Sequence, residues 1–347
     1  MTKSELLRQD AEQIWQQWRP VLSALQGKRI LVTGATGLIG SSLIRMLADM
    51  KVACQVIAVV RNQQKAMQMF GDLAPDFIDY IVSDVAEPFC VSGQVDYVIH
   101  AANQTSSRAF VEAPVDTILT AVKGTRNVLV LAREKQVKSL VYLSSMEIYG
   151  APQTDAKIYE THGANIDTMA TRSSYPESKR MCESLCRAYY AQYGVPAKVI
   201  RLSQTFGPGL AYNDGRVPAE FSRCVIEKKN IVLHTDGQTR RSYLYTADAV
   251  SAILAILLRG TDGEAYNATN EESYCSILEM AELVAQKCAA GEIAVQIQFA
   301  DAEKMGYAPK LCMNLDTTKL QNLGWTPRYG LEEIFNRTIT SMREARP

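Results

Sequence analysis

Tyr175 and Lys179 are the two residues whose types and spacing most directly suggest chemistry. They stand four positions apart in the segment Tyr-Pro-Glu-Ser-Lys, and residues at i and i+4 share one face of a helix. A free tyrosine has a pKa of about 10, but a neighbouring ammonium favours the phenolate and lowers that pKa. We therefore expect Tyr175 to act as a general base with Lys179 as its partner. The same spacing also occurs on ordinary helix faces, so the other motifs decide its meaning.

A serine and a glutamate follow a predicted strand at 140–144. Ser145 lies where that strand ends, and doubly wound sheets bind their ligands at this carboxyl edge. Its hydroxyl could hydrogen-bond a substrate hydroxyl, or simply satisfy backbone groups. Glu147 could act as an acid or a base, or it could hold Tyr149 or a loop. We count both Ser145 and Glu147 as candidate catalytic residues.

A glycine-rich segment follows the first predicted strand and opens a helix. Its glycines have the spacing G-x-x-G-x-x-G. Glycine permits a tight turn and a close approach to a pyrophosphate, and the helix N-terminus offers free N–H groups and a positive dipole end. A tight packing turn is the alternative interpretation. The motif predicts a dinucleotide site formed by Gly34, Thr36, Gly37, Leu38, Ile39 and Gly40.

Two charged residues at strand ends bear on which dinucleotide is bound. Asp84 ends the third predicted strand, where we expect it near the adenine together with Val85. The second strand ends at Arg61. An acidic residue there would hold the ribose 2′-hydroxyl of NAD, whereas arginine accommodates a 2′-phosphate. Arg61 by itself therefore favours NADP.

The elements that must position these residues alternate between strand and helix. Continuous apolar runs predict strands at 28–33, 55–61, 80–83, 95–100, 140–144 and 197–202, with helices at 41–50, 116–136 and 176–193 between them. This alternation indicates βαβ units, and continuous apolar strands indicate a sheet buried on both faces. The fold class is α/β, a doubly wound parallel Rossmann sheet.

Beyond residue 205 the alternation weakens. We predict helices at 247–258, 276–288 and 331–343 and a strand at 293–299. The chain is accordingly divided into a helical extension at 1–26, a nucleotide-binding domain at 27–205 and, at 206–347, mainly a smaller substrate-binding lobe interleaved with it. The extension carries an apolar stripe, and Pro20 must bend or end its helix. It is predicted to pack on the main domain or on a partner subunit.

Composition excludes several classes of function. The 347 residues contain 37 Lys+Arg and 37 Asp+Glu, so no basic excess invites nucleic acid. No apolar run is long enough to span a membrane, and the polar N-terminus is unlike a signal peptide. The eight cysteines and three histidines show no metal-ligand spacing. We predict a cytoplasmic protein without a metal site.

The motifs together resemble an extended short-chain dehydrogenase/reductase of the NAD-dependent nucleotide-sugar epimerase/dehydratase type. The segments that carry the resemblance span about residues 28–340 and are GATGLIG, VIHAAN, SSMEIYG, YPESK, IRLSQTFGPG, NDGRV, RRSYLYTADAV and LDTTKLQNLGW. The resemblance implies that Tyr175 is the base, that Lys179 also holds the nicotinamide ribose, and that Ser145 anchors the hydroxyl. It adds Ala101 and Ala102 to the cofactor site, and it implies tightly held NAD in place of NADP.

The same resemblance implies a reaction through a transient 4-keto sugar. Dehydratases carry an Asp-Glu pair where this chain has Met146-Glu147, which puts ordinary 4,6-dehydration in doubt. UDP-glucuronate decarboxylases are closer here, because they share the glutamate and the NDGRV segment. We expect an epimerase or dehydratase, with a decarboxylase as first alternative and an NADPH-dependent reductase or a non-catalytic cofactor-binding protein as others. The candidate substrate-binding residues are Gln204, Asn213, Arg216 and Arg241.

The resemblance also implies a homodimer. Members of this family pair through two helices that correspond here to about 116–136 and 176–193. The expected partners are thus a nucleotide-sugar substrate and a second copy of the chain.

Overall fold

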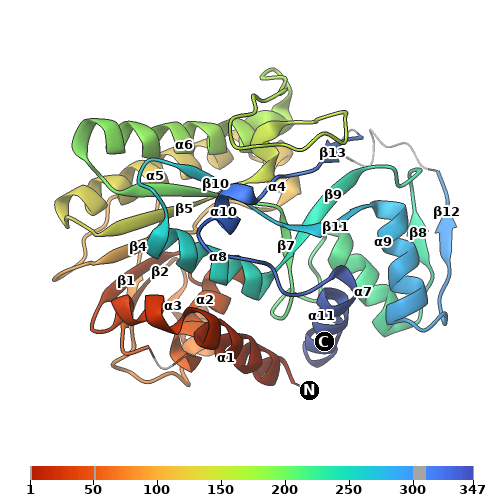
Figure 1. The fold of residues 1–347 in the computed structure, drawn as a ribbon, viewed down its shortest axis with the longest axis horizontal. Coiled ribbons are helices and arrows are strands. Elements are labelled where there is room, and N and C mark those ends of the chain that lie inside the picture. The colour runs from red at the N-terminus through yellow and green to blue at the C-terminus, as the bar shows by residue number, and fades with distance from the viewer. Residues whose placement is uncertain (1, 51, 300–309, 347) are drawn as a thin grey trace.

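A seven-stranded parallel sheet is the centre of the computed structural model, which describes residues 2–50, 52–299 and 310–346 (Figure 1). Its strand order is β10-β6-β5-β4-β1-β2-β3. The strands are β1 (Arg29–Thr33), β2 (Gln55–Val60), β3 (Ile78–Val82), β4 (Tyr97–His100), β5 (Ser139–Ser145), β6 (Ala197–Leu202) and β10 (Ala265–Ala268). The order reverses between β1 and β4, so the carboxyl ends of these two strands flank the crevice in which such sheets bind ligands.

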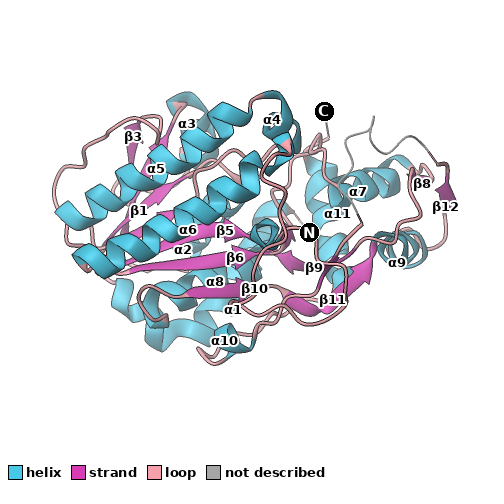
Figure 2. Cartoon of the chain, turned by 90° about the horizontal axis from the view of Figure 1, so that it is seen from above, coloured by secondary structure: helices cyan, strands magenta, loops and turns pink. Residues whose placement is uncertain are grey.

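The sheet strands are apolar because both faces are covered. Alternate residues of β1 face opposite cores: Ile30 and Val32 lie in one, and Leu31 lies in the other. Helices α2 (Leu38–Asp49) and α8 (Thr246–Arg259) pack on the first face, while α5 (Pro114–Glu134) and α6 (Ser174–Tyr193) pack on the second (Figure 2). The predicted α/β fold is confirmed. Short helices α3 (Gln63–Phe70) and α4 (Ser107–Glu112) complete this part.

A second, four-stranded sheet lies beyond the carboxyl edge of the first. Strand β9 (Arg240–Tyr245) is its centre and pairs with β7 (Gln204–Phe206), β11 (Asn270–Ser276) and β13 (Cys312–Met313). Around it lie α7 (Val217–Glu227), α9 (Ile277–Leu283), α10 (Thr318–Gln321), α11 (Leu331–Glu344) and a small pair of strands, β8 (Ile231–Leu233) and β12 (Val295–Ile297). The predicted strand at 293–299 is thus shorter than expected, and the helix expected at 276–288 continues from α9 as a π-helix.

The division of the chain near residue 205 stays a prediction. Two elements beyond that position, α8 and β10, belong to the first sheet and its covering layer. The sequence did not predict β10, because its four residues, AYNA, include a polar side chain that is fully buried.

The N-terminal extension forms one long helix, α1 (Lys3–Leu22), followed by a short 3-10 turn. Its apolar stripe is buried against the main domain, and Pro20 stands in its last turn, so the helix ends two residues later. Figure 1 shows α1 close to α2, α8 and α11. In the parts of the chain described, no helix has the length and apolar character needed to cross a bilayer.

Candidate active site

The glycine loop lies between the end of β1 and the start of α2. Gly34 has a positive φ of 66° and sits so close to the backbone of Ala101 and Ala102 that an added Cβ would lie 2.7 Å from it. An added Cβ at Gly40 would collide with the carbonyl oxygen of Gly34. Gly37 is the N-cap of α2 and has no side chain, so no capping side chain occupies the first N–H groups of the helix. Such a loop fits the pyrophosphate of a dinucleotide.

A series of buried, hydrogen-bonded side chains lies next to this loop. The Thr33 hydroxyl lies 2.7 Å from Nδ1 of His100 and accepts a hydrogen bond from the N–H of Ala102, and Nε2 of His100 lies 3.2 Å from the Thr125 hydroxyl. Complete burial lowers the pKa of His100 to about 3, and the Lys179 ammonium lowers it further. His100 is therefore a neutral hydrogen-bonding group at the carboxyl end of β4. No spacing or motif in the sequence indicated this role for His100.

The other predicted cofactor residues lie at the same sheet edge. Arg61 is exposed directly after β2. Asp84 follows β3 and accepts a hydrogen bond from the N–H of Ala86, while the Val85 side chain packs against Gly124 of α5. These positions agree with a dinucleotide lying along the carboxyl ends of β1 to β3. Their individual roles stay predictions.

Tyr175 and Lys179 lie one helical turn apart at the start of α6, as the spacing predicts. Both are buried. The Tyr175 ring stacks on Phe110 of α4 with centroids 4.2 Å apart, and Nζ of Lys179 lies 5.9 Å from the Tyr175 ring centre. The Lys179 ammonium also donates a 2.5 Å hydrogen bond to the carbonyl of Leu143. Tyr175 is thus held against α4 and Lys179 against β5.

The pKa of Tyr175 differs from the expectation. Burial raises this pKa above its ordinary value and the Glu147 carboxylate raises it further, while the Ser145 hydroxyl and the charges of Arg172 and Arg216 lower it. The net shift of the Tyr175 pKa is therefore upward, opposite to the lowering expected from a neighbouring ammonium. The pKa of Lys179 itself is lowered to about 8 by burial. Removal of water from the ring thus outweighs the attraction of nearby cations.

Ser145 and Glu147 lie beside Tyr175, and the structure adds a residue that the sequence analysis missed. The Ser145 hydroxyl accepts a 3.2 Å hydrogen bond from the N–H of Glu147 at the start of a 3-10 turn. The Glu147 carboxylate forms an ion pair with Arg172, with 3.1 Å between Oε2 and Nη1. Arg172 precedes Tyr175 by three residues, but its segment has no periodic pattern that could have indicated a partner. Both members of this pair remain about one-third exposed.

A second polar network holds the turn that carries Glu147. Arg201 of β6 pairs with Glu183 of α6 at 2.7 Å and donates to the Tyr149 hydroxyl at 2.8 Å. Tyr149 in turn donates to Asn267 of β10. The Tyr149 hydroxyl is thus held by Arg201 and Asn267. Of the two supporting roles considered for Glu147, the contact with a loop is the one observed, because its carboxylate pairs with Arg172 of the segment before α6.

The four predicted substrate-binding residues come from two places beside this cluster. Gln204 of β7 and Arg241 of β9 lie on paired strands, and Nε of Arg241 is buried with no hydrogen-bond partner in the described parts of the chain. Asn213 and Arg216 lie in the loop before α7. Arg216 forms an ion pair with Asp214 and donates to the carbonyl of Thr205, whereas Asn213 is exposed. The charge of Arg216 acts on Tyr175, so this loop borders the site.

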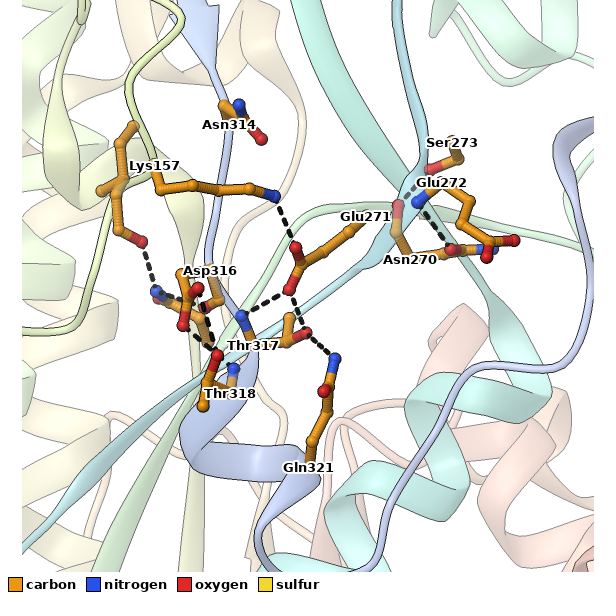
Figure 3. A network of polar contacts seen from close by, with 12 residues as sticks. Lys157, Asn270, Glu271, Glu272, Ser273, Asn314, Asp316, Thr317, Thr318 and Gln321 are labelled. Carbon is orange, nitrogen blue, oxygen red and sulfur yellow. Dashed lines mark hydrogen bonds and ion pairs between the residues drawn. The ribbon is translucent and has the colours of Figure 1, made fainter.

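The loop that leaves the site after Gly150 is tied to the second sheet. Figure 3 shows the Glu271 carboxylate of β11 between Lys157 of this loop and Thr317, which precedes α10. Gln321 donates to the Thr317 hydroxyl at 2.9 Å. Three segments far apart in the sequence are thereby joined.

A parallel sheet with a glycine loop, and a tyrosine–lysine pair next to a serine at the same carboxyl edge, defines a nicotinamide-dinucleotide-dependent enzyme. The chain belongs to the NAD-dependent epimerase/dehydratase family, whose model matches residues 30–269. The predicted family and its cofactor, NAD, are confirmed. The NADP alternative raised by Arg61 stays a hypothesis.

Individual relatives agree with this family. The chain is 30% identical over 332 residues to UDP-glucuronic acid decarboxylase 1 of Xenopus tropicalis, covering 95% of this chain and 76% of that protein. It is also 30% identical over 319 residues to UDP-glucuronic acid decarboxylase 1 of Arabidopsis thaliana, covering 91% and 70%. Among solved structures, the epimerase Mth375 of Methanothermobacter thermautotrophicus superposes with a TM-score of 0.79 at 23% identity, covering 95% and 96%, which supports the fold.

Proposed function

We propose that this protein oxidises the C4 hydroxyl of a nucleotide sugar, changes the resulting 4-keto sugar, and reduces it again. The observation that carries the proposal is the convergence of Tyr175, Lys179 and Ser145 with the glycine loop at one edge of the sheet. Bound NAD would supply the hydride acceptor at C4 and return the same hydride at the end. Gly34, Gly37 and Gly40 would hold its pyrophosphate.

The side chains of the site would handle the protons. Ser145 would hydrogen-bond the C4 hydroxyl and fix its direction, and the phenolate of Tyr175 would accept its proton as the hydride leaves. The buried Lys179 ammonium would stabilise that phenolate. Burial disfavours the phenolate, and the positively charged nicotinamide ring of bound NAD would offset part of this cost beside Lys179.

A uronic acid is the substrate that the charged groups favour most. Arg172 and Arg216 lie near Tyr175, are each about one-third exposed, and each pairs with a carboxylate of the chain that a substrate carboxylate could displace. After oxidation at C4, the C6 carboxylate of a uronic acid is β to a ketone. Carbon dioxide can then leave with the C5–C6 electrons moving to the C4 oxygen, and C5 afterwards takes a proton. The decarboxylase relatives support this alternative, and epimerisation at C4 or C5 needs the same first step.

The test is mass spectrometry of the purified protein incubated with UDP-glucuronate and with a panel of UDP-, dTDP-, CDP- and GDP-sugars. Loss of carbon dioxide would identify decarboxylation, loss of water dehydration, and unchanged mass with altered mobility epimerisation. If no sugar nucleotide is changed and no nicotinamide is released on denaturation, the proposal is wrong and a non-catalytic role replaces it.

We also propose a homodimer that works in the cytoplasm. Exposed apolar side chains gather on α5 and α6, where Val115 is 64% and Met181 53% exposed, and a second copy of the same helices would cover them. All eight cysteines are free thiols, which suits a reducing compartment. Light scattering at micromolar concentration checks the dimer, and a monomer would contradict it.

A further inference from the structure

The N-terminal helix α1 carries a buried carboxylate that contacts the end of strand β9 in the second sheet. Asp10 of α1 is only 1% exposed. One of its carboxylate oxygens accepts from Nη2 of Arg337 at 2.7 Å, and the other accepts from the Tyr245 hydroxyl at 2.6 Å. Nε of Arg337 donates to the same hydroxyl at 2.9 Å. A closed triangle therefore joins α1, α11 and the end of β9.

A second contact from the same helix lies beside this triangle. The Arg337 guanidinium is 4.6 Å from the ring centre of Tyr329, and that ring meets Tyr245 edge-on at 4.9 Å. The Tyr329 hydroxyl donates to Gln13 of α1, whose side chain and carbonyl also accept from Arg328. Gln13, Arg328 and Tyr329 are partly exposed, whereas the three residues of the triangle are buried. The buried groups are costly to separate, because each would lose a partner that water does not replace.

The same buried face of α1 that carries Asp10 also packs on the part of the chain that contains α2 and α8. Its buried apolar side chains, among them Ile14 and Trp18, lie in the same core as α2 and α8. Helix α2 begins at the glycine loop. The helix α1 thus links the loop that binds the cofactor to the strand that ends at Tyr245.

Strand β9 leads directly to the candidate substrate-binding residues. Tyr245 is its last residue and lies opposite Phe206 of β7, while Tyr243 lies opposite Gln204. Arg241 is four residues before Tyr245 on the same strand. A shift of Tyr245 would therefore move Gln204 and Arg241 relative to the glycine loop.

From this geometry we propose that Asp10 is a positioning residue, which sets the place of strands β7 and β9 and thereby the affinity for the nucleotide sugar. The role of these strands in substrate binding rests on the proposed function. The buried hydrogen bonds of Asp10 with Tyr245 and Arg337 are independent of that function. Burial raises the pKa of Asp10 to about 6, so its carboxylate is ionised and paired with Arg337 at pH 8. The charged and titratable groups that interact with Asp10 are Tyr245, Arg328, Tyr329, Arg337 and, from α8, Asp248.

The experiment compares Asp10→Asn with Glu12→Gln, a matched amide replacement at an exposed position of the same helix. Hydrogen–deuterium exchange of the full-length protein at pH 8 is followed in β7, β9, β1 and β2. For Asp10→Asn we expect exchange in β7 and β9 to accelerate on the order of tenfold, with β1 and β2 unchanged. Tyr245→Phe, which removes only the hydroxyl, should produce the same pattern.

Kinetics with UDP-glucuronate separates positioning from general support. In Asp10→Asn the KM should rise on the order of tenfold, with kcat and the amount of bound NAD unchanged. Exchange in β7 and β9 equal to that of Glu12→Gln, acceleration spread evenly over β1 and β2, or a fall in kcat at unchanged KM would overturn the proposal. If UDP-glucuronate is not a substrate, that result contradicts only the proposed reaction, and the exchange measurement still decides the role of Asp10.

Discussion

Two carboxylate–arginine pairs in this protein have similar geometry but opposite surroundings. Glu147 and Arg172 lie 3.1 Å apart beside Tyr175, with 29% and 36% of their side chains exposed. Asp10 and Arg337 lie 2.7 Å apart with 1% and 7% exposed. An exposed pair is screened and contributes little to stability, whereas one partner of a buried pair cannot be removed without leaving a charge in an apolar core. The exposed Glu147–Arg172 pair, here called the open pair, can exchange partners when a substrate binds. The buried Asp10–Arg337 pair, here called the closed pair, is suited to fixing one geometry.

The largest expected effect is a loss of catalytic rate at Tyr175, which lies beside the exposed Glu147–Arg172 pair. Tyr175→Phe removes the phenolic oxygen that, as phenolate, would accept the proton, so kcat should fall by about 10²- to 10⁴-fold. The ring and its stacking on Phe110 remain, so the melting temperature and the bound NAD should stay unchanged. Turnover assays and calorimetry check this. Full activity in the variant would show that another group is the base.

At the buried Asp10–Arg337 pair, the expected effect is a loss of folding stability. Asp10→Ala leaves the buried Arg337 guanidinium with only the half-exposed Glu333 carboxylate, 3.5 Å away, as a counter-ion. The free energy of unfolding should fall by about 3–5 kcal/mol. Denaturant unfolding measures it, with Glu12→Ala as the exposed control. If both variants unfold at the same denaturant concentration, the closed pair does not differ from a surface pair.

Glu147→Gln tests the difference between the two pairs, because it removes the carboxylate charge of the open pair with little change of side-chain shape. We expect kcat to fall by about 10²-fold if the carboxylate moves a proton, while the free energy of unfolding changes by less than about 1 kcal/mol. Chemical denaturation and turnover are measured on the same preparation. A loss of stability as large as that of Asp10→Ala would remove the distinction between the two pairs.

His100 extends the comparison to a group that is buried without charge. Its pKa falls from 6.5 to about 3 on folding, so only the unfolded chain binds a proton between these values. Its contribution to stability is present above pH 6.5 and is lost as the pH falls toward 3. Between pH 6.5 and pH 5 this loss is about 2 kcal/mol. His100→Asn, which cannot titrate, should show a correspondingly weaker pH dependence in urea unfolding, and an unchanged dependence would contradict the assignment.

The nucleotide-binding half was predictable because its signals are local. Continuous apolar runs produced β1, β2, β5 and β6, and glycine spacing located the turn before α2. In the second sheet, β11 reads NEESYCS and has no apolar run, since it is held by side-chain contacts such as the one between Glu271 and Thr317. No local pattern marks it as a strand.

The candidate site divides in the same way. Tyr175, Lys179 and Ser145 were found from spacing and from their place after a strand. The partner of Glu147 lies 25 residues away, and Asp10 and Arg337 are separated by 327 positions, so only the fold brings these groups together. The raised pKa of Tyr175 was missed for the same reason, because burial by Phe110 and proximity to Glu147 are tertiary properties.

The most direct test of the central claim follows the hydrogen on C4. UDP-glucuronate carrying deuterium at C4 is incubated with the protein and unlabelled NAD, and the product is examined by mass spectrometry and NMR. Oxidation and return of the same hydride within one site predict a product that keeps deuterium on C4. A product without deuterium at C4, or with deuterium released into free NADH, would contradict the account.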